Sequence, residues 1–198
     1  MKTFNVLLKR NIKMFFNDKA MFFTSLITPV ILLVLYATFL GNVYRDSFLS
    51  SLPEGFSLDG KIIDGFVGGQ LVSSLLAVCC VTVSFCSNML MVQDKVSKAR
   101  TDFEITPVKK SVLSLSYFTA TFISTLIISI AASAVCLLYI LKCGWYLSLS
   151  DILLMALDIV LLVLFGTAIS SLINSFLKTQ GQISAVGTIV SSGYGFIS

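Results

Sequence analysis

Long uncharged stretches alternate with short charged segments along the 198 residues of the chain. Residues 20–44, 65–93 and 111–141 carry no charge, and each run exceeds the roughly 20 residues that cross the hydrocarbon core of a bilayer. Two further runs are 152–173, which holds one charge, and 179–198. The pattern predicts an all-α fold, a polytopic transmembrane helix bundle forming a single domain over 1–198. We expect spans at 20–41, 66–92, 111–141 and 152–173, and a partial fifth span at 183–198.

The segments outside the spans are short and polar. Predicted loops cover 42–65, 93–110, 142–151 and 174–182. Ahead of the first span, residues 1–19 place apolar side chains at helical spacing, namely Phe4, Leu7, Leu8, Ile12, Phe15 and Phe16. This spacing predicts an amphipathic helix in the membrane interface, with a basic face on the lipid headgroups. A basic flank without a helix is the alternative.

The composition supports a membrane solvent and argues against an enzyme. Apolar residues make up 56% of the chain, and the mean hydropathy is +0.94, more than a soluble core needs. Histidine, the usual general base and the commonest metal ligand, is absent. The five cysteines form no C-x-x-C pair, so neither a zinc site nor a disulfide framework is indicated. We therefore expect no catalytic and no metal-binding residues.

The basic residues gather on alternate segments. Residues 1–19, 93–110 and 174–182 hold eleven of the fourteen Lys and Arg side chains. The positive-inside rule places these segments, and hence the N-terminus, in the cytoplasm. The segments 42–65 and 142–151 are accordingly predicted to be extracellular.

The stretch VQDKVSKARTDFEITPVKK, residues 92–110, concentrates eight charges in nineteen residues. Val96, Ala99 and Phe103 give it one narrow apolar face, so we predict a short helix over Asp94–Ile105. Thr106-Pro107 is expected to end this helix and to start the next span, with Thr106 as N-cap.

Small and polar residues inside the spans have two interpretations. Two rows recur every four positions: Thr121, Thr125, Ser129 and Ser133, then Gly187, Ser191 and Gly195. Such rows let helices approach closely, although a polar transport path is an alternative. Asp158 is a substrate contact, a partner for Lys142 or a carboxylate that snorkels to the surface. Candidates for a substrate path are Asp158, Gln70, Asn88 and Asn174, the last three being equally suited to interhelical hydrogen bonds or span boundaries.

At this point the sequence resembles a family. The N-terminal helix, a first span with an internal proline (SLITPVILLVLYATFLG), a long second span, the charged stretch and GQISAVGTIVSSGYGFIS together resemble the membrane subunit of an ABC-2 type transporter. That family has a coupling helix between its second and third spans, and commonly reads TP before basic or polar residues, as at Thr106 and Pro107. It usually has six spans, so the resemblance implies that this chain is truncated at its C-terminus.

The resemblance also implies partners and a location. They are an ATP-binding subunit, a second permease subunit in a homo- or heterodimer, and membrane lipids, with no nucleic acid. The chain has no G-x-x-x-x-G-K-[ST] phosphate loop, so ATP and Mg²⁺ are expected in the partner ATPase and not here. The expected location is the cytoplasmic (plasma) membrane, and the expected direction of transport is export.

We expect the partner ATPase to grip the charged segment and move it as a lever, with apolar anchors at the centre of the contact and charges at its rim. The residues expected to contact the ATPase are Asp94, Lys95, Val96, Lys98, Arg100, Asp102, Phe103, Glu104, Thr106 and Pro107. A solvated loop is the simpler alternative for this segment. For the whole chain, the alternatives are an ion-gradient-driven secondary transporter or channel, an integral-membrane enzyme and a membrane scaffold.

Overall fold

The computed structural model describes residues 2–35, 38–39, 41–51, 60–106, 108–143 and 148–197, and this part of the chain is almost entirely helical, with no strand. The helices are α1 (Lys2–Asn17), α2 (Lys19–Leu35), α3 (Gly41–Ser50), α4 (Gly60–Val96), α5 (Ala99–Ile105), α6 (Lys110–Cys143), α7 (Leu149–Phe176) and α8 (Gln180–Ile197). The predicted all-α fold is confirmed.

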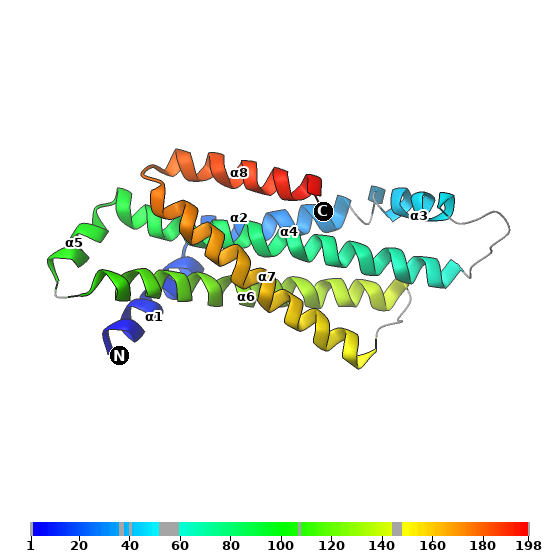
Figure 1. Ribbon diagram of the computed structural model, residues 1–198, viewed down its shortest axis with the longest axis horizontal. Helices are drawn as coiled ribbons and strands as arrows, with labels where there is room; N and C mark the ends of the chain where they lie inside the picture. Colours follow the sequence, from blue (N-terminus) through cyan, green and yellow to red (C-terminus); the bar gives the residue numbers. More distant parts are fainter. Residues whose placement is uncertain are drawn as a thin grey trace.

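α4 is the central helix of the bundle. It runs beside α6 along most of its length, α7 crosses both at an angle, and α2 and α8 also pack against it (Figure 1). Its 37 residues extend about 55 Å at 1.5 Å per residue. Since a bilayer is only about 40–45 Å thick with its headgroups, the ends of α4 reach the interfaces or beyond.

The main core lies between α4, α6 and α7. Its buried members are Val72, Leu75, Leu76, Cys79, Cys80, Cys136, Ile140, Ile159 and Val163. In the most apolar window of α4 83% of the residues are buried, against 22% in α7. Most of the exposed large hydrophobic side chains of α7 are leucines, so this helix presents apolar surface to lipid or to another helix.

Within the described residues, three helices are long and apolar enough to cross a membrane: Ile62–Val96, Lys110–Leu138 and Leu149–Phe176. A fourth span is possible if α1 and α2, which meet at a bend of 70°, are counted together. The structure thus confirms a polytopic α-helical bundle. The expected number of five spans, and the sidedness of the loops, stay predictions.

The predicted helix over Asp94–Ile105 is wrong at its start. Asp94 and Val96 still belong to α4, and α5 begins only at Ala99. The break falls at Lys98, whose φ of 63° is the only left-handed value at a non-glycine residue in the described part of the chain. The helix end is as predicted, because Thr106 is extended, but α6 begins at Lys110 and not at the proline.

Two of the predicted loops are partly helical in the structure. Residues 42–65, predicted as an extracellular loop, include most of the helix α3 and the first turn of α4. Residues 149–151, placed in the next loop, already belong to α7. The backbone N–H of Ser148 donates to the Asp151 carboxylate at 2.8 Å. This hydrogen bond caps the N-terminus of α7, which explains why the helix begins this early.

Candidate functional site

A buried carboxylate joins three helices near the α5 end of the bundle. Asp94, in the last turn of α4, is only 3% exposed. The Arg10 guanidinium of α1 donates to both of its oxygens, from Nη1 to Oδ2 at 2.8 Å and from Nη2 to Oδ1 at 3.1 Å. The Tyr117 hydroxyl of α6 donates to the same Oδ2. Asp94 therefore ties α1 and α6 to the end of α4.

The amphipathic pattern of α1 explains how Arg10 reaches this position. Leu7, Asn11 and Phe15 recur every four residues and form its buried face. Leu7 packs on Leu113 and Tyr117 of α6. Arg10 lies at the edge of this face, so its stem follows the helix surface while its guanidinium reaches Asp94.

Polar contacts around Arg10 complete the network. Its Nη1 also donates to Asn11 Oδ1 at 2.9 Å, and Asn11 Nδ2 donates to Ser116 Oγ at 3.4 Å. The pKa of Arg10 is raised, chiefly because its hydrogen bonds to Asp94 favour the charged form and outweigh the opposing effect of burial. The Arg10 guanidinium is therefore charged at every physiological pH.

Phe103 connects α5 to the same network. The Arg10 Cζ atom lies 4.9 Å from the centroid of the Phe103 ring, within the range of a cation–π contact. The ring also packs against the cluster of Leu7, Leu113 and Tyr117. Phe103 thus joins α5 to Arg10 and to the α1–α6 contact.

Lys95, the next residue after Asp94, binds the end of α7. Its Nζ donates to the backbone carbonyls of Asn174 at 2.9 Å, Ser175 at 3.0 Å and Leu177 at 3.3 Å. Carbonyls in the last turn of a helix lack partners in that helix, and the dipole favours a cation there. We use the name α4 clasp for this set of groups: Asp94 and Lys95 with their partners Arg10, Tyr117 and the carbonyls at the end of α7.

The chain breaks its helix directly after the clasp. The N–H of Ser97 still donates to the Gln93 carbonyl at 2.8 Å, but Lys98 adopts the left-handed conformation. A non-glycine residue in that conformation costs about 1–2 kcal/mol. α5 is therefore a separate short element, held by Phe103 on one side and joined to α4 by a two-residue break.

The predicted ATPase contacts divide into two groups. Asp94, Lys95 and Phe103 are engaged inside the chain. The exposed members are Val96, Lys98, Asp102 and Thr106. The side chains of Arg100 and Glu104, and all of Pro107, lie outside the described residues. Sequence reasoning missed Ile105, which is 80% exposed and gives α5 an outward apolar side chain.

The four candidates for a substrate path do not share one site. Asn88 and Asn174 are buried between α4 and α7, where Asn88 Nδ2 donates to Ser170 at 3.2 Å and Ser171 at 2.9 Å. Gln70 lines a pocket of about 340 Å³ beside α3. Asp158 is exposed on α7. Only Asn88 and Asn174 are thus brought to the same interface.

The two small-residue rows have different surroundings. Thr121, Thr125, Ser129 and Ser133 are all buried on α6, and the Ser129 hydroxyl lies 3.4 Å from Cys80 Sγ of α4. Gly187 of α8 has nothing within 4 Å of the place where a Cβ would lie. For Ser191 and Gly195 only the helical backbone is described.

Sequence reasoning missed three positions at contacts between helices. Arg10 and Tyr117 complete the clasp, and Tyr117 lies four residues before Thr121, so it extends the polar row of α6. Gly166 lets α7 approach α4, because a Cβ there would lie 2.9 Å from Ser84 Oγ and 3.3 Å from the Cys80 carbonyl. A glycine four residues before Ser170 and eight before Asn174 was the available signal.

Comparison with known proteins bears on the family of the chain. In the described ranges, no group of three or more His, Cys, Asp or Glu side chains could hold a metal ion. No curated protein and no solved structure matches the chain. A family model described as ABC-2 type transporter matches residues 2–197, nearly the whole sequence. The chain therefore belongs to the ABC-2 type transporter family, and with its apolar helices it is a multi-pass membrane protein of the permease type.

Proposed function

We propose that this chain is the permease subunit of an ATP-driven exporter, and that a separate ATPase subunit acts on α5. Membership of the ABC-2 family supports the transport role. The observation that carries the proposal is the position of α5, a short helix between the left-handed Lys98 and the extended Thr106. An element isolated between two breaks in this way can move as a unit without unwinding α4 or α6.

The two faces of α5 have complementary roles in this mechanism. Ile105 on α5 and Val96 just before it, 80% and 51% exposed, supply apolar side chains to the ATPase. Lys98 and Asp102 add charges at the rim, where they steer and orient the partner more than they add affinity. Phe103 faces the bundle and contacts Arg10. A push on the outer face therefore changes the contact on the inner face.

The α4 clasp would spread this movement through the bundle. Displacing Phe103 weakens the cation–π contact that holds the Arg10 guanidinium. Arg10 and Tyr117 share Asp94, and Lys95 next to it holds the end of α7. α1, α6 and α7 are thus linked through two adjacent residues of α4. We propose that ATP closes the partner, shifts α5 and alternates the access of the bundle.

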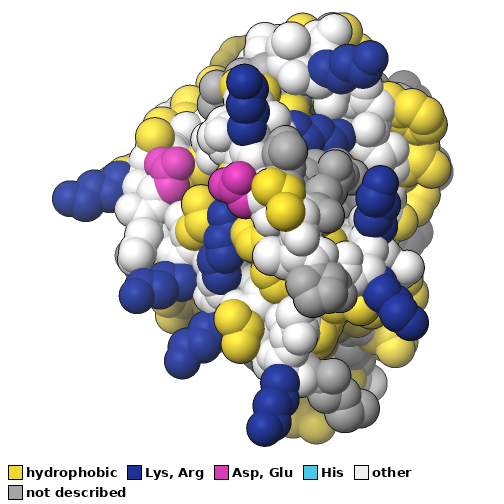
Figure 2. Space-filling model, turned by 90° about the vertical axis from the view of Figure 1, so that its left-hand side faces the viewer, with side chains coloured by type: hydrophobic (Ala, Val, Ile, Leu, Met, Phe, Trp, Pro, Cys, Tyr) yellow, Lys and Arg dark blue, Asp and Glu magenta, His cyan; other side chains and the backbone are white. Residues whose placement is uncertain are grey.

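The charge distribution supports a cytoplasmic place for α5. Lys and Arg side chains surround the end of the molecule that carries α5, while acidic side chains are few on this face (Figure 2). Along the chain, the basic residues at or next to this end include those of α1, Lys98 before α5, Lys109 and Lys110 at the start of α6, and Lys178 after α7. A basic end is typical of the cytoplasmic side. We propose the plasma membrane, an N-terminus inside, a second permease subunit, and ATP with Mg²⁺ bound by the ATPase.

Affinity purification of the chain from its own membranes tests the proposal. We expect an ATPase subunit to co-purify with the wild type and to be lost with Ile105→Asp, because a charge replaces the outward apolar contact. Lys178→Glu is the matched control, since it changes an exposed cation at the same end but outside α5. Recovery of equal amounts of the ATPase with Ile105→Asp, or of none with the wild type, would contradict the proposal.

A further inference from the structure

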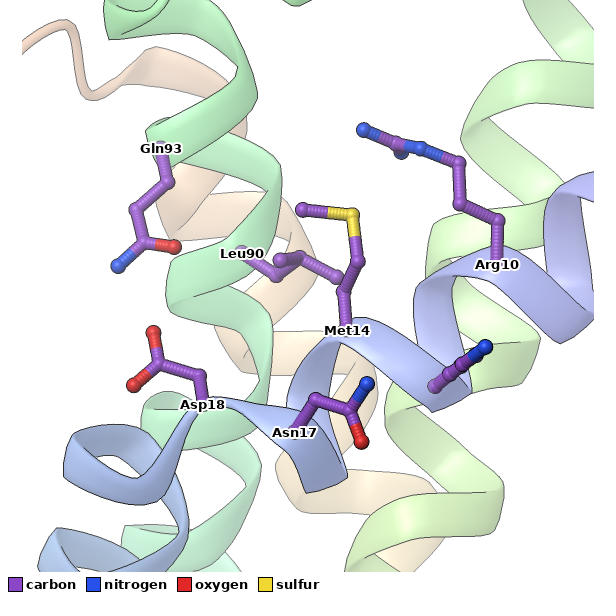
Figure 3. A pocket seen from close by; sticks show the side chains of 7 residues that line it. Arg10, Met14, Asn17, Asp18, Leu90 and Gln93 are labelled. Atoms are coloured by element: carbon purple, nitrogen blue, oxygen red, sulfur yellow. The ribbon is translucent and has the colours of Figure 1, made fainter.

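An open pocket lies where the bend between α1 and α2 meets α4. Its volume is about 510 Å³, within the range of small-molecule sites. In Figure 3, Asp18 and Gln93 lie on one side of the pocket, Arg10 on the other, and Met14 and Leu90 between them. Lys13 and Asn17 of α1 complete the lining.

The free charges of this pocket are one cation and one carboxylate. Arg10 is already neutralised by its two hydrogen bonds to Asp94. Lys13 is exposed and forms no ion pair within the described residues. The Asp18 Oδ1 atom accepts the N–H groups of Ala20 at 3.0 Å and Met21 at 3.2 Å, while Oδ2 accepts none in the described part of the chain. The pocket therefore suits a ligand that carries both signs of charge.

The polar and apolar groups of the pocket are separated in a way that fits an amphiphile. The amides of Asn17 and Gln93 make no hydrogen bond to another described side chain, so they can bind a ligand. Met14 and Leu90 provide apolar surface beside them. Because α1 and α2 meet at 70°, an interfacial α1 places this pocket at the boundary between headgroups and acyl chains.

We propose that the pocket binds a phospholipid whose headgroup carries a primary ammonium, as in phosphatidylethanolamine, from the leaflet at the α5 end. Lys13 and the side-chain amide of Asn17 bind the phosphate. The Asp18 carboxylate and the side-chain carbonyl of Gln93 accept the ammonium N–H groups. An acyl chain lies along Met14 and Leu90. The bound lipid joins the α1–α2 bend to α4, next to the clasp residue Arg10.

The same chemistry disfavours the other common headgroups. A choline headgroup has no N–H to give Asp18, and none of the lining residues is aromatic, whereas quaternary ammonium groups are typically bound by aromatic faces. An anionic glycerol headgroup satisfies Lys13 but leaves the Asp18 carboxylate beside a negative phosphate. The inference does not depend on the ATPase, because all of these groups belong to α1, α4 and the bend after α1.

Native mass spectrometry of the purified full chain in detergent tests this proposal. The protein is titrated separately with phosphatidylethanolamine, phosphatidylcholine and phosphatidylglycerol. We expect roughly tenfold tighter binding of phosphatidylethanolamine, and a loss of about that size in Asp18→Asn, since one charge-assisted hydrogen bond is removed. Asn is as good an N-cap as Asp, so this variant keeps the start of α2. Lys13→Ala should weaken all three lipids, and Gln93→Ala mainly the first.

Lys9→Ala is the matched control, because Lys9 is an exposed lysine of α1 outside the pocket. It should leave the preference unchanged. Equal binding of the three lipids, a preference for phosphatidylglycerol, or an unchanged preference in both Asp18→Asn and Gln93→Ala would overturn the proposal. So would equally tight binding of soluble glycerophosphoethanolamine, since the apolar contacts would then be irrelevant.

Discussion

The two ends of α4 carry ion pairs that differ in nearly every physical respect. At the α5 end, the Asp94 side chain is 4% exposed. It accepts two hydrogen bonds from Arg10 and a third from Tyr117. At the other end, Arg45 of α3 lies 3.2 Å from Asp64 of α4, and the two side chains are 45% and 40% exposed. Water screens both members of the second pair, whereas in the first pair it reaches only Arg10, whose side chain is 28% exposed.

This difference shows which end of the bundle depends on its charges. A buried ion pair adds little to the free energy of unfolding compared with well-packed apolar residues of similar size. Removing one partner, however, leaves the other charge buried and uncompensated. An exposed pair can lose either partner to water at almost no cost. We therefore expect substitutions at the α5 end to have much larger effects than those at the α3 end.

The largest effect is expected from Arg10→Met. It leaves the Asp94 carboxylate buried without its cation, and we expect a loss of about 3 kcal/mol in the free energy of unfolding in detergent. The double variant Arg10→Met/Asp94→Leu should recover most of this loss, because no charge is then stranded. A double variant as unstable as the single one would show that the cost comes from lost packing.

Gly166→Ala should rank next. The added Cβ meets Ser84 Oγ and the backbone of α4, so we expect a loss of about 1–3 kcal/mol by overpacking. Gly187→Ala is the matched control on α8, with open space at its Cβ, and should be neutral or slightly stabilising. Equal thermal stability of the two variants would mean that α4 and α7 can separate freely at this point.

Lys95→Met should have a smaller and local effect. Three carbonyls at the end of α7 lose their donor, and we expect a loss of about 1–2 kcal/mol in local stability. Hydrogen exchange should become faster in residues 170–177 and stay unchanged at the start of α7. Lys98→Met, an exposed neighbour, is the control and should leave both segments unchanged.

Arg45→Ala should have the smallest effect. We expect the free energy of unfolding to fall by less than about 1 kcal/mol, and by still less at high salt, because both partners are accessible to water. A double-mutant cycle with Asp64→Asn measures the pair directly. A coupling energy comparable with that of Arg10 and Asp94 would show that the two ends of α4 depend equally on their ion pairs, contrary to our expectation.

Much of the fold follows from the sequence, because it depends on lengths of apolar stretches and on local helical spacing. Both rules act within a few residues, so α1, α4, α6 and α7 were predictable. The end of α5 was predictable too, since Thr106 precedes a proline. The break at Lys98 was not, because neither glycine nor proline marks it.

The α4 clasp was beyond the sequence for a different reason. Asp94 and Arg10 are 84 residues apart, and both lie in charged segments where exposure to water is the natural expectation. Their pairing depends on how α1 docks on α6, which is a tertiary property. The same holds for the contact between Phe103 and Arg10, which joins residues 93 positions apart in the sequence.

The central claim is that a movement of α5 reaches α1 through Phe103 and Arg10. Hydrogen exchange on the complex with the proposed ATPase subunit, measured with and without a non-hydrolysable ATP analogue, tests it most directly. We predict that the analogue changes exchange in residues 99–105 and 2–17 of the wild type, but only in 99–105 of Phe103→Ala. An unaltered response of residues 2–17 in Phe103→Ala would contradict the account.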